Sequence, residues 1–169
     1  GKGTLLEIGC GSGALSIRAA LSWPEAEVTG IDYWGAVYNY SQAMCESNAW
    51  SEGVSERCRF LHGDARKLDF PDETFDAVVS NYVYHNINGS DKKELLLESL
   101  RVLKKGGVFA LNDDMKPHMY GDVEAFAEKL RKMGYQEVRI IDTAQEAFGS
   151  HRRAALMMLG DSRMLAGRK

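Results

Sequence analysis

Proline, cysteine and long apolar runs are all scarce in this sequence of 169 residues. We expect the three prolines, Pro24, Pro71 and Pro117, to lie in connections between elements. No apolar run approaches the ~20 residues of a membrane-spanning helix, and we expect no signal peptide. A hydrophobic fraction of 44% with 27% charged residues is typical of a soluble globular protein. The length favours a single domain over residues 1–169.

The three cysteines, Cys10, Cys45 and Cys58, form no pattern that would bind a metal or crosslink the chain. No two of them have the Cys-x-x-Cys spacing of a zinc site, so we expect no metal. The odd count favours reduced thiols and a cytoplasmic location. We interpret Cys10, within a glycine-rich turn, as a small residue chosen for its fit, because no histidine is near it in the sequence.

The sequence also lacks an excess of basic residues. Its formal net charge is −3. Nucleic-acid-binding proteins usually display a basic face, so we do not expect nucleic acid as a partner. The basic residues that we expect to form a solvated C-terminal tail are Arg152, Arg153, Arg163, Arg168 and Lys169.

Short β-like segments alternate along the chain with longer segments of helical periodicity. The predicted strands cover residues 4–9, 26–32, 57–62, 75–81, 108–113, 135–142 and 152–160. The predicted helices cover residues 13–23, 36–53, 91–107 and 122–134, with Ser90 or Asp91 as the N-cap of the third and Gly106 and Gly107 at its end. This alternation predicts a doubly wound α/β sheet. The connection before the last strand is too short for a parallel crossover, so the seventh strand is predicted to be antiparallel.

The segment LLEIGCGSGALS places three glycines directly after the first predicted strand. Gly9, Gly11 and Gly13 are spaced two apart, whereas the dinucleotide-binding pattern is GxGxxG, so the turn alone leaves the ligand open. Ligands of such sheets bind at the carboxyl ends of the strands. Asp32 ends the second strand, where it could accept hydrogen bonds from ribose hydroxyls, and Asp64 follows the third, where it could accept from an adenine amino group. For both residues, a surface aspartate in a turn is the alternative.

These motifs together resemble the class I S-adenosylmethionine-dependent methyltransferases over nearly the whole chain. LLEIGCGSG is similar to the first family motif, E/D-x-G-x-G-x-G, and GIDYW to the second. HGDARKLDFPDETFDAVVSNYVYHNI is similar to the third through the fourth, and RVLKKGGVFALND to a segment often written LKPGG, with Lys105 in place of proline. The resemblance implies a Rossmann-like seven-stranded sheet of order 3-2-1-4-5-7-6. It also implies S-adenosylmethionine as cofactor, with S-adenosylhomocysteine as its product.

The resemblance further implies roles for residues by their positions. The residues expected to bind the cofactor are Glu7, Gly9, Cys10, Gly11, Gly13, Asp32, Tyr33, Gly63, Asp64, Ala65 and Asn81. Glu7 would stabilise the glycine turn, Tyr33 would border the adenine, and Asn81 would lie near the methionine part. For Tyr33 and Trp34, packing against the following helix is an equal alternative.

A catalytic base is needed only if the acceptor must lose a proton. His85 is the first candidate for a base or a substrate contact, and Tyr82 is the second. The alternative for His85 is a histidine that packs under the cofactor or caps the next loop. Asp113 and Asp114 would bind a cationic acceptor or cap a loop, and we favour the cap. Amino-methylating nucleic-acid enzymes of the family carry Asn/Asp-Pro-Pro-Tyr/Phe here, but Tyr82 and Val83 replace both prolines.

We therefore expect a methyltransferase that acts by in-line displacement on a small-molecule or lipid-like acceptor. The alternatives are a non-catalytic cofactor-binding module and an NAD-dependent oxidoreductase, which the glycine spacing and the lack of a Tyr-x-x-x-Lys pair disfavour. Because the first strand begins almost at residue 4, we expect a further N-terminal segment in the native chain, and membrane contact only through it. The acceptor and the oligomeric state do not follow from the sequence.

Overall fold

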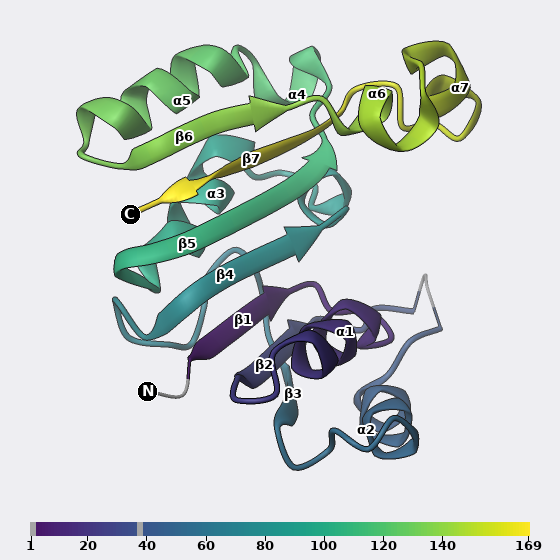
Figure 1. Cartoon of the computed structure of the whole chain (residues 1–169). Helices are drawn as coiled ribbons and strands as arrows, with labels where there is room; N and C mark the ends of the chain where they lie inside the picture. The colour runs from purple at the N-terminus through teal and green to yellow at the C-terminus, as the bar shows by residue number, and fades with distance from the viewer. Residues whose placement is uncertain (1–2, 37–38) are drawn as a thin grey trace.

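The fold is built around a seven-stranded sheet in the order β3-β2-β1-β4-β5-β7-β6 (Figure 1). The computed structural model describes residues 3–36 and 39–169. The strands are β1 (Thr4–Ile8), β2 (Glu27–Asp32), β3 (Cys58–His62), β4 (Phe75–Asn81), β5 (Leu103–Asp114), β6 (Gln136–Ile141) and β7 (Ser162–Arg168). The helices are α1 (Ala14–Ser22), α2 (Gln42–Ser51), the 3-10 turn η1 (Tyr84–Asn86), α3 (Lys92–Arg101), α4 (Pro117–Tyr120), α5 (Val123–Lys132), α6 (Thr143–Phe148) and α7 (His151–Leu156).

The strand pairing places the carboxyl ends of five parallel strands along one edge of the sheet. β1 is hydrogen-bonded to both β2 and β4, and the chain passes from β3 at one edge back to β4. β7 runs antiparallel to both of its neighbours, β5 and β6. The predicted strand order and the antiparallel seventh strand are therefore confirmed. The point where the order reverses, between β1 and β4, is where sheets of this type bind ligands.

Alternating residues of the strands face two hydrophobic clusters on opposite faces of the sheet. Leu6, on one face, belongs to a cluster that includes buried side chains of α3, α4 and α5. Leu5, on the other face, belongs to a smaller cluster with side chains of α1 and α2. Period-2 alternation in β1 thus assigns its neighbouring leucines to different layers. In Figure 1, α1 and α2 lie beside β1 to β3, and α5 lies beside β6.

The prediction of a strand over residues 152–160 is wrong. This segment contains α7, which follows α6 directly, and the seventh strand is Ser162–Arg168. A short apolar run suits a helix or a strand equally well. The run in this segment is also not buried, since Leu156 is 83% exposed and Met158 is 79% exposed.

The third helix ends earlier than predicted, and the C-terminal basic residues are not all a solvated tail. Asp91 is its N-cap, as one of the two predicted residues, but the helix ends at Arg101 and β5 begins at Leu103. Arg163 and Arg168 lie in β7. The Lys169 ammonium donates to the carbonyls of Leu100 at 2.9 Å and Leu103 at 2.8 Å, so it satisfies acceptors at the end of α3.

The second helix is also shorter than predicted, because α2 begins at Gln42 and not at residue 36. The Ser41 hydroxyl accepts a hydrogen bond from the Met44 backbone N–H and caps the helix there. Part of the predicted span, residues 37–38, lies outside the described residues.

Candidate cofactor and active site

The glycine turn is folded tightly against the end of β2. Gly9, Gly11 and Gly13 have φ angles of +75°, +55° and +82°, which only glycine adopts without strain. The Gly9 N–H donates to the Ile31 carbonyl at 2.8 Å, and the next N–H donates to the same oxygen. A Cβ on Gly9 would lie 2.1 Å from Cγ2 of Val83, so the turn is also in contact with the segment after β4.

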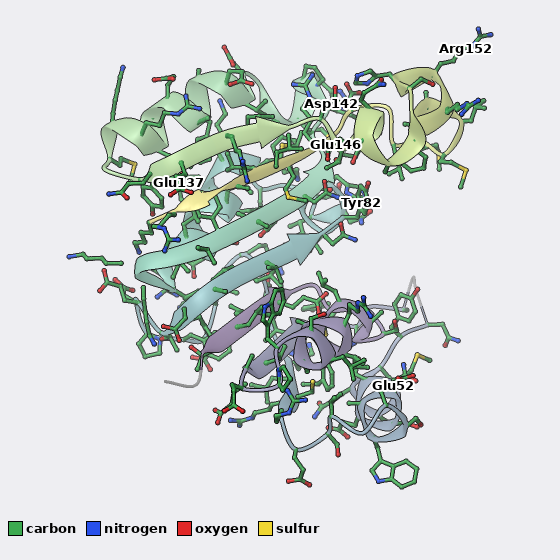
Figure 2. The ribbon with its side chains drawn as sticks, in the orientation of Figure 1. Glu52, Tyr82, Glu137, Asp142, Glu146 and Arg152 are labelled. Atoms are coloured by element: carbon green, nitrogen blue, oxygen red, sulfur yellow. The ribbon has the colours of Figure 1, made fainter. Side chains whose placement is uncertain are left out.

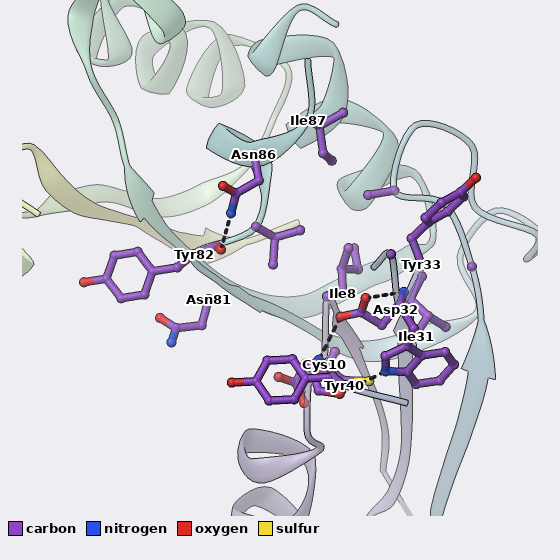
Figure 3. A pocket seen from close by; sticks show the side chains of 18 of the residues that line it. Ile8, Cys10, Ile31, Asp32, Tyr33, Tyr40, Asn81, Tyr82, Asn86 and Ile87 are labelled. Carbon is purple, nitrogen blue, oxygen red and sulfur yellow. Dashed lines mark hydrogen bonds between the residues drawn. The ribbon is translucent and has the colours of Figure 1, made fainter. Parts of the chain in front are cut away.

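Asp32, at the end of β2, holds this turn through its carboxylate (Figure 3). One carboxylate oxygen accepts from the Gly11 N–H at 2.8 Å, and the other accepts from the Trp34 N–H at 2.8 Å. The Trp34 indole N–H donates in turn to the Gly11 carbonyl at 2.9 Å. Each carboxylate oxygen has two acceptor sites, so Asp32 can hold the turn and still accept hydrogen bonds from a ligand.

Glu7 connects β1 to the first turn of α1. Its side chain is buried, and it accepts a hydrogen bond of 2.5 Å from the Ser16 hydroxyl. Burial raises the pKa of Glu7 to about 7, although the hydrogen bonds from Ser16 oppose the shift. The contact joins the two elements on either side of the glycine turn, which is where the predicted turn-stabilising role requires it.

A cavity of about 820 Å³ opens at the carboxyl ends of β1 to β4. The predicted site residues that line it are Glu7, Gly9, Cys10, Gly11, Asp32, Tyr33, Gly63, Asp64, Ala65, Asn81, Tyr82 and His85. Gly13 does not line it but packs inward, because a Cβ there would lie 3.0 Å from the Phe60 ring. Further lining residues that the sequence did not indicate include Tyr40, Ile87 and Leu159. Leu159 was missed because its segment was predicted to be a strand.

Two residues predicted to contact the adenine are already engaged with neighbours. The Asp64 carboxylate accepts two hydrogen bonds from Arg66 Nε, at 2.9 and 3.0 Å, and forms an ion pair of 2.6 Å with the same guanidinium. The Arg66 side-chain hydrogen bond lowers the pKa of Asp64. The Tyr33 side chain is exposed and its ring lies 5.1 Å from the His62 ring. The predicted packing of Tyr33 against the following helix is therefore not what anchors it.

A chain of polar side chains crosses the ends of β4, β5 and β7. Asn112 donates to the Asn81 carbonyl oxygen at 2.8 Å and accepts from the Thr143 hydroxyl at 2.8 Å. The Ser162 hydroxyl lies 2.8 Å from that of Thr143 and 2.7 Å from that of Tyr82. Figure 3 shows the Tyr82 ring directed away from Asp32. The Tyr82 hydroxyl is thus part of this network, while its φ of +58° marks the sharp turn after β4.

His85 is held at the cavity by a buried carboxylate. Its ring Nδ1 is bonded to Asp113, and its backbone N–H donates to the other Asp113 oxygen at 2.8 Å. The side chain of His85 is 25% exposed and that of Asp113 is 0% exposed. The predicted binding of a cationic methyl acceptor by Asp113 is wrong, because this carboxylate is fully buried. Asp113 accepts from the backbone N–H of His85 in η1, which agrees with the predicted role as a cap. Asp114 is 2% exposed and pairs with Lys116 at 2.9 Å.

The cysteines and acidic residues form no metal site within residues 3–36 and 39–169, where no group of three or more His, Cys, Asp or Glu side chains could hold an ion. All three cysteines are free thiols and buried. By length and hydropathy, none of the helices in the described part of the chain could cross a membrane.

The sequence matches a protein-family model described as "Methyltransferase domain" over residues 6–111. The match covers more than half of the chain and includes the glycine turn, Asp32 and His85. The chain belongs to the class I S-adenosylmethionine-dependent methyltransferases. This confirms the family and the fold that the motifs implied.

Two curated relatives illustrate the family. The 27-O-demethylrifamycin SV methyltransferase of Amycolatopsis mediterranei is 30% identical over 151 residues, which cover 89% of this chain and 52% of that one. The demethylmenaquinone methyltransferase of Listeria welshimeri is 32% identical over 127 residues, which cover 74% and 51%. The methyltransferase chain described here therefore spans about half the length of these relatives.

Solved structures share the fold at low sequence identity. A geranyl diphosphate methyltransferase in complex with SAM has a TM-score of 0.71 and 18% identity, with 98% of this chain and 77% of that one covered. The [4+2]-cyclase SpnF has a TM-score of 0.69 and 23% identity, with 100% and 76% covered. At these identities the likeness extends to the fold alone.

Proposed function

We propose that this methyltransferase transfers a methyl group from S-adenosylmethionine to a hydroxyl oxygen of a small-molecule or lipid-like acceptor, with His85 as the general base. The observation that supports this most is the pairing of His85 with the buried carboxylate of Asp113 beside the cavity. A base held in this way suits an acceptor that must lose a proton. The acceptor is proposed to be a small molecule and not nucleic acid.

The cavity fits a nucleoside-sized cofactor. Its volume of about 820 Å³ lies within the range of roughly 300–1,000 Å³ of small-molecule sites. Gly11 presents bare backbone to the cavity, Asp32 retains acceptor sites for a ribose, and the Asp64 region would receive the adenine. When bound there, S-adenosylmethionine supplies an electrophilic methyl group on a sulfonium. Asn81 would lie near the methionine part.

The chemistry of His85 follows from its two ring nitrogens. An ionised carboxylate only accepts hydrogen bonds, so Asp113 requires a proton on Nδ1 of His85. The lone pair is then on Nε2, at the opposite edge of a ring that lines the cavity. Nε2 has no hydrogen-bond partner among the residues that the structure describes. It can therefore take the proton of an acceptor hydroxyl, and the Asp113 charge stabilises the imidazolium that forms.

The class of acceptor is supported by the relatives and by the lining of the cavity. The names of two relatives describe an O-methyltransferase of a rifamycin and a methyltransferase of demethylmenaquinone. Ile87 and Leu159 add apolar side chains to the cavity lining, and Tyr40 adds an aromatic ring beside Gly11. We infer an acceptor with an apolar body and one reactive hydroxyl.

Two measurements test this function. Calorimetry with S-adenosylhomocysteine measures cofactor binding, and no binding at high micromolar ligand would exclude the proposal. Release of homocysteine equivalents from S-adenosylmethionine, measured over a panel of hydroxyl-bearing acceptors, tests turnover. His85→Gln is expected to lower kcat by about 10²-fold or more with little change in S-adenosylhomocysteine affinity.

The alternatives give different outcomes in the same measurements. A non-catalytic binding module would bind S-adenosylhomocysteine and turn over no acceptor in the panel. An NAD-dependent oxidoreductase would instead bind NADH, which fluorescence titration detects.

A further inference from the structure

The Asp113 carboxylate receives a donor at each of its acceptor positions. One oxygen accepts from the Asp114 N–H at 2.8 Å and is bonded to the His85 ring. The other accepts from the His85 backbone N–H at 2.8 Å and from the Tyr120 hydroxyl at 2.5 Å. Two donors for each oxygen saturate an ionised carboxylate, and the group is fully buried. Its plane is therefore fixed by partners from η1, β5 and α4.

Tyr120 donates to Asp113 from a separate element, α4, whereas the other donors belong to His85 and to the adjacent residue Asp114. It ends the one-turn helix α4, is 2% exposed, and belongs to the larger hydrophobic cluster. Burial and the charge of Asp113 raise the pKa of the Tyr120 phenol far above its ordinary value. The hydroxyl therefore stays protonated and donates over the whole range in which a protein is folded.

The orientation of Asp113 decides which ring nitrogen of His85 carries the proton. A carboxylate locked in this plane accepts from Nδ1–H and leaves Nε2 unprotonated. A carboxylate free to rotate about its last bond would hold the ring less firmly, and the other tautomer would become populated. The Tyr120 hydroxyl thus fixes the Asp113 carboxylate, and the hydrogen bond between this carboxylate and Nδ1 fixes the His85 ring in turn.

We propose that Tyr120 is a positioning residue for His85, because its hydroxyl fixes the Asp113 carboxylate that selects the Nδ1–H form of the histidine. The proposal rests on the function proposed above for His85. It assigns to α4, which does not line the cavity, a part in the reaction. Tyr120 acts through Asp113 and touches neither cofactor nor acceptor.

The chain offers a closely matched control in Tyr84. This tyrosine is also fully buried in the same cluster, and its hydroxyl bonds the Ser99 hydroxyl at 2.9 Å and not Asp113. Tyr84→Phe and Tyr120→Phe each remove one buried hydroxyl. A purely structural effect would appear in both variants, whereas a positioning effect would appear only in Tyr120→Phe.

The experiment is ¹⁵N nuclear magnetic resonance of the histidine rings in the full chain, with the His85 signals assigned from their loss in His85→Gln. The wild type and Tyr84→Phe are expected to show a protonated Nδ1 and an unprotonated Nε2. Tyr120→Phe is expected to broaden the Nδ1–H signal and to add the Nε2–H form. In turnover, Tyr120→Phe is expected to lower kcat by about tenfold at unchanged KM for S-adenosylmethionine.

Three results would overturn the proposal. A wild-type His85 protonated on Nε2 would do so without any variant. An unchanged His85 spectrum in Tyr120→Phe, or an equal change in Tyr84→Phe, would do so as well. If no acceptor is turned over by any variant, the proposed function fails on that measurement, while the ring spectra still decide whether Tyr120 positions the histidine.

Discussion

At the scale of single residues, Glu7 shows how a buried carboxyl makes stability depend on pH. Its pKa is about 7 in the fold against an ordinary value of 4.5, so the folded protein keeps a proton that the unfolded chain has lost. Between these two values, the unfolded state gains relative stability as the pH rises. The free-energy cost of burying Glu7 therefore grows as the pH rises to about 7 and stays constant at higher pH.

We predict that Glu7→Gln flattens the stability of the protein between pH 5 and pH 8. The wild type is expected to lose up to about 3 kcal/mol more than the variant over this range. Urea unfolding at several pH values measures the difference. Glu52→Gln, which alters an exposed glutamate labelled in Figure 2, is the control and should follow the wild type. Parallel curves for wild type and Glu7→Gln would contradict the prediction.

Asp32 has two tasks, which are to hold the turn and to meet a ribose. Asp32→Asn keeps an oxygen that can accept from the Gly11 N–H, but it removes the charge that a ribose would meet and leaves the Trp34 N–H without its acceptor. We predict a loss of S-adenosylhomocysteine affinity of about 10- to 100-fold by calorimetry, the effect of one charge-assisted hydrogen bond. Asp69→Asn, at an exposed position outside the cavity lining, should bind as the wild type does. Equal affinity in Asp32→Asn would show that Asp32 only shapes the turn.

At the scale of elements, the glycine turn depends on the segment after β4 as much as on its own backbone. Gly9→Ala would strain a left-handed residue and place a Cβ 2.1 Å from Val83. We predict a destabilisation of about 3 kcal/mol in thermal or urea unfolding. Gly53→Ala has a similar φ of +71° with no atom within 4 Å, so it should cost only about 1 kcal/mol.

The double variant Gly9→Ala with Val83→Ala tests whether the collision causes the difference. Removing the Val83 methyl groups should recover part of the lost stability. If the losses of stability in the two single variants simply add in the double variant, the collision contributes nothing and backbone strain alone explains the loss.

The sequence predicted most elements because each has a strong local signal, and it failed where that signal was ambiguous. β1 joins a buried apolar run to a glycine turn, so both its type and its role could be predicted. Residues 152–160 are apolar without a clear period, and only tertiary packing decides that they form α7 and a loop. The end of α3 was missed because Leu103 is buried equally well in a helix or a strand.

The candidate site was predictable in its members and not in its contacts. His85 follows β4 and Asp113 lies at the carboxyl end of the neighbouring parallel strand β5, so their meeting at one edge of the sheet was foreseeable. That Nδ1 of His85 meets Asp113, and that Tyr120 fixes the carboxylate, depends on side-chain directions that no spacing encodes. Arg66 beside Asp64 was likewise outside what the motif could indicate.

At the scale of the whole molecule, the cavity is lined by the ends of several strands that are distant in the sequence. Binding of S-adenosylhomocysteine should therefore protect backbone amides in residues 9–13, 32–35, 63–66 and 81–86 together, in hydrogen exchange read by mass spectrometry. At about 100 times its Kd, the ligand should stabilise the fold by about 2.7 kcal/mol. Amides of α5, which lies outside the cavity lining, should change only through this global effect. Protection confined to one of the four segments would mean that they do not form a common site.

The position of β7 between β5 and β6 has a consequence for the newly made chain. On the ribosome, both neighbours are synthesised before the strand that joins them, so each waits with an unpaired edge. The carbonyls at the end of α3 likewise lack the hydrogen bonds from Lys169 until that residue has been synthesised. A chaperone would therefore protect this chain best from aggregation after β6 has left the ribosome and before β7 has paired with it.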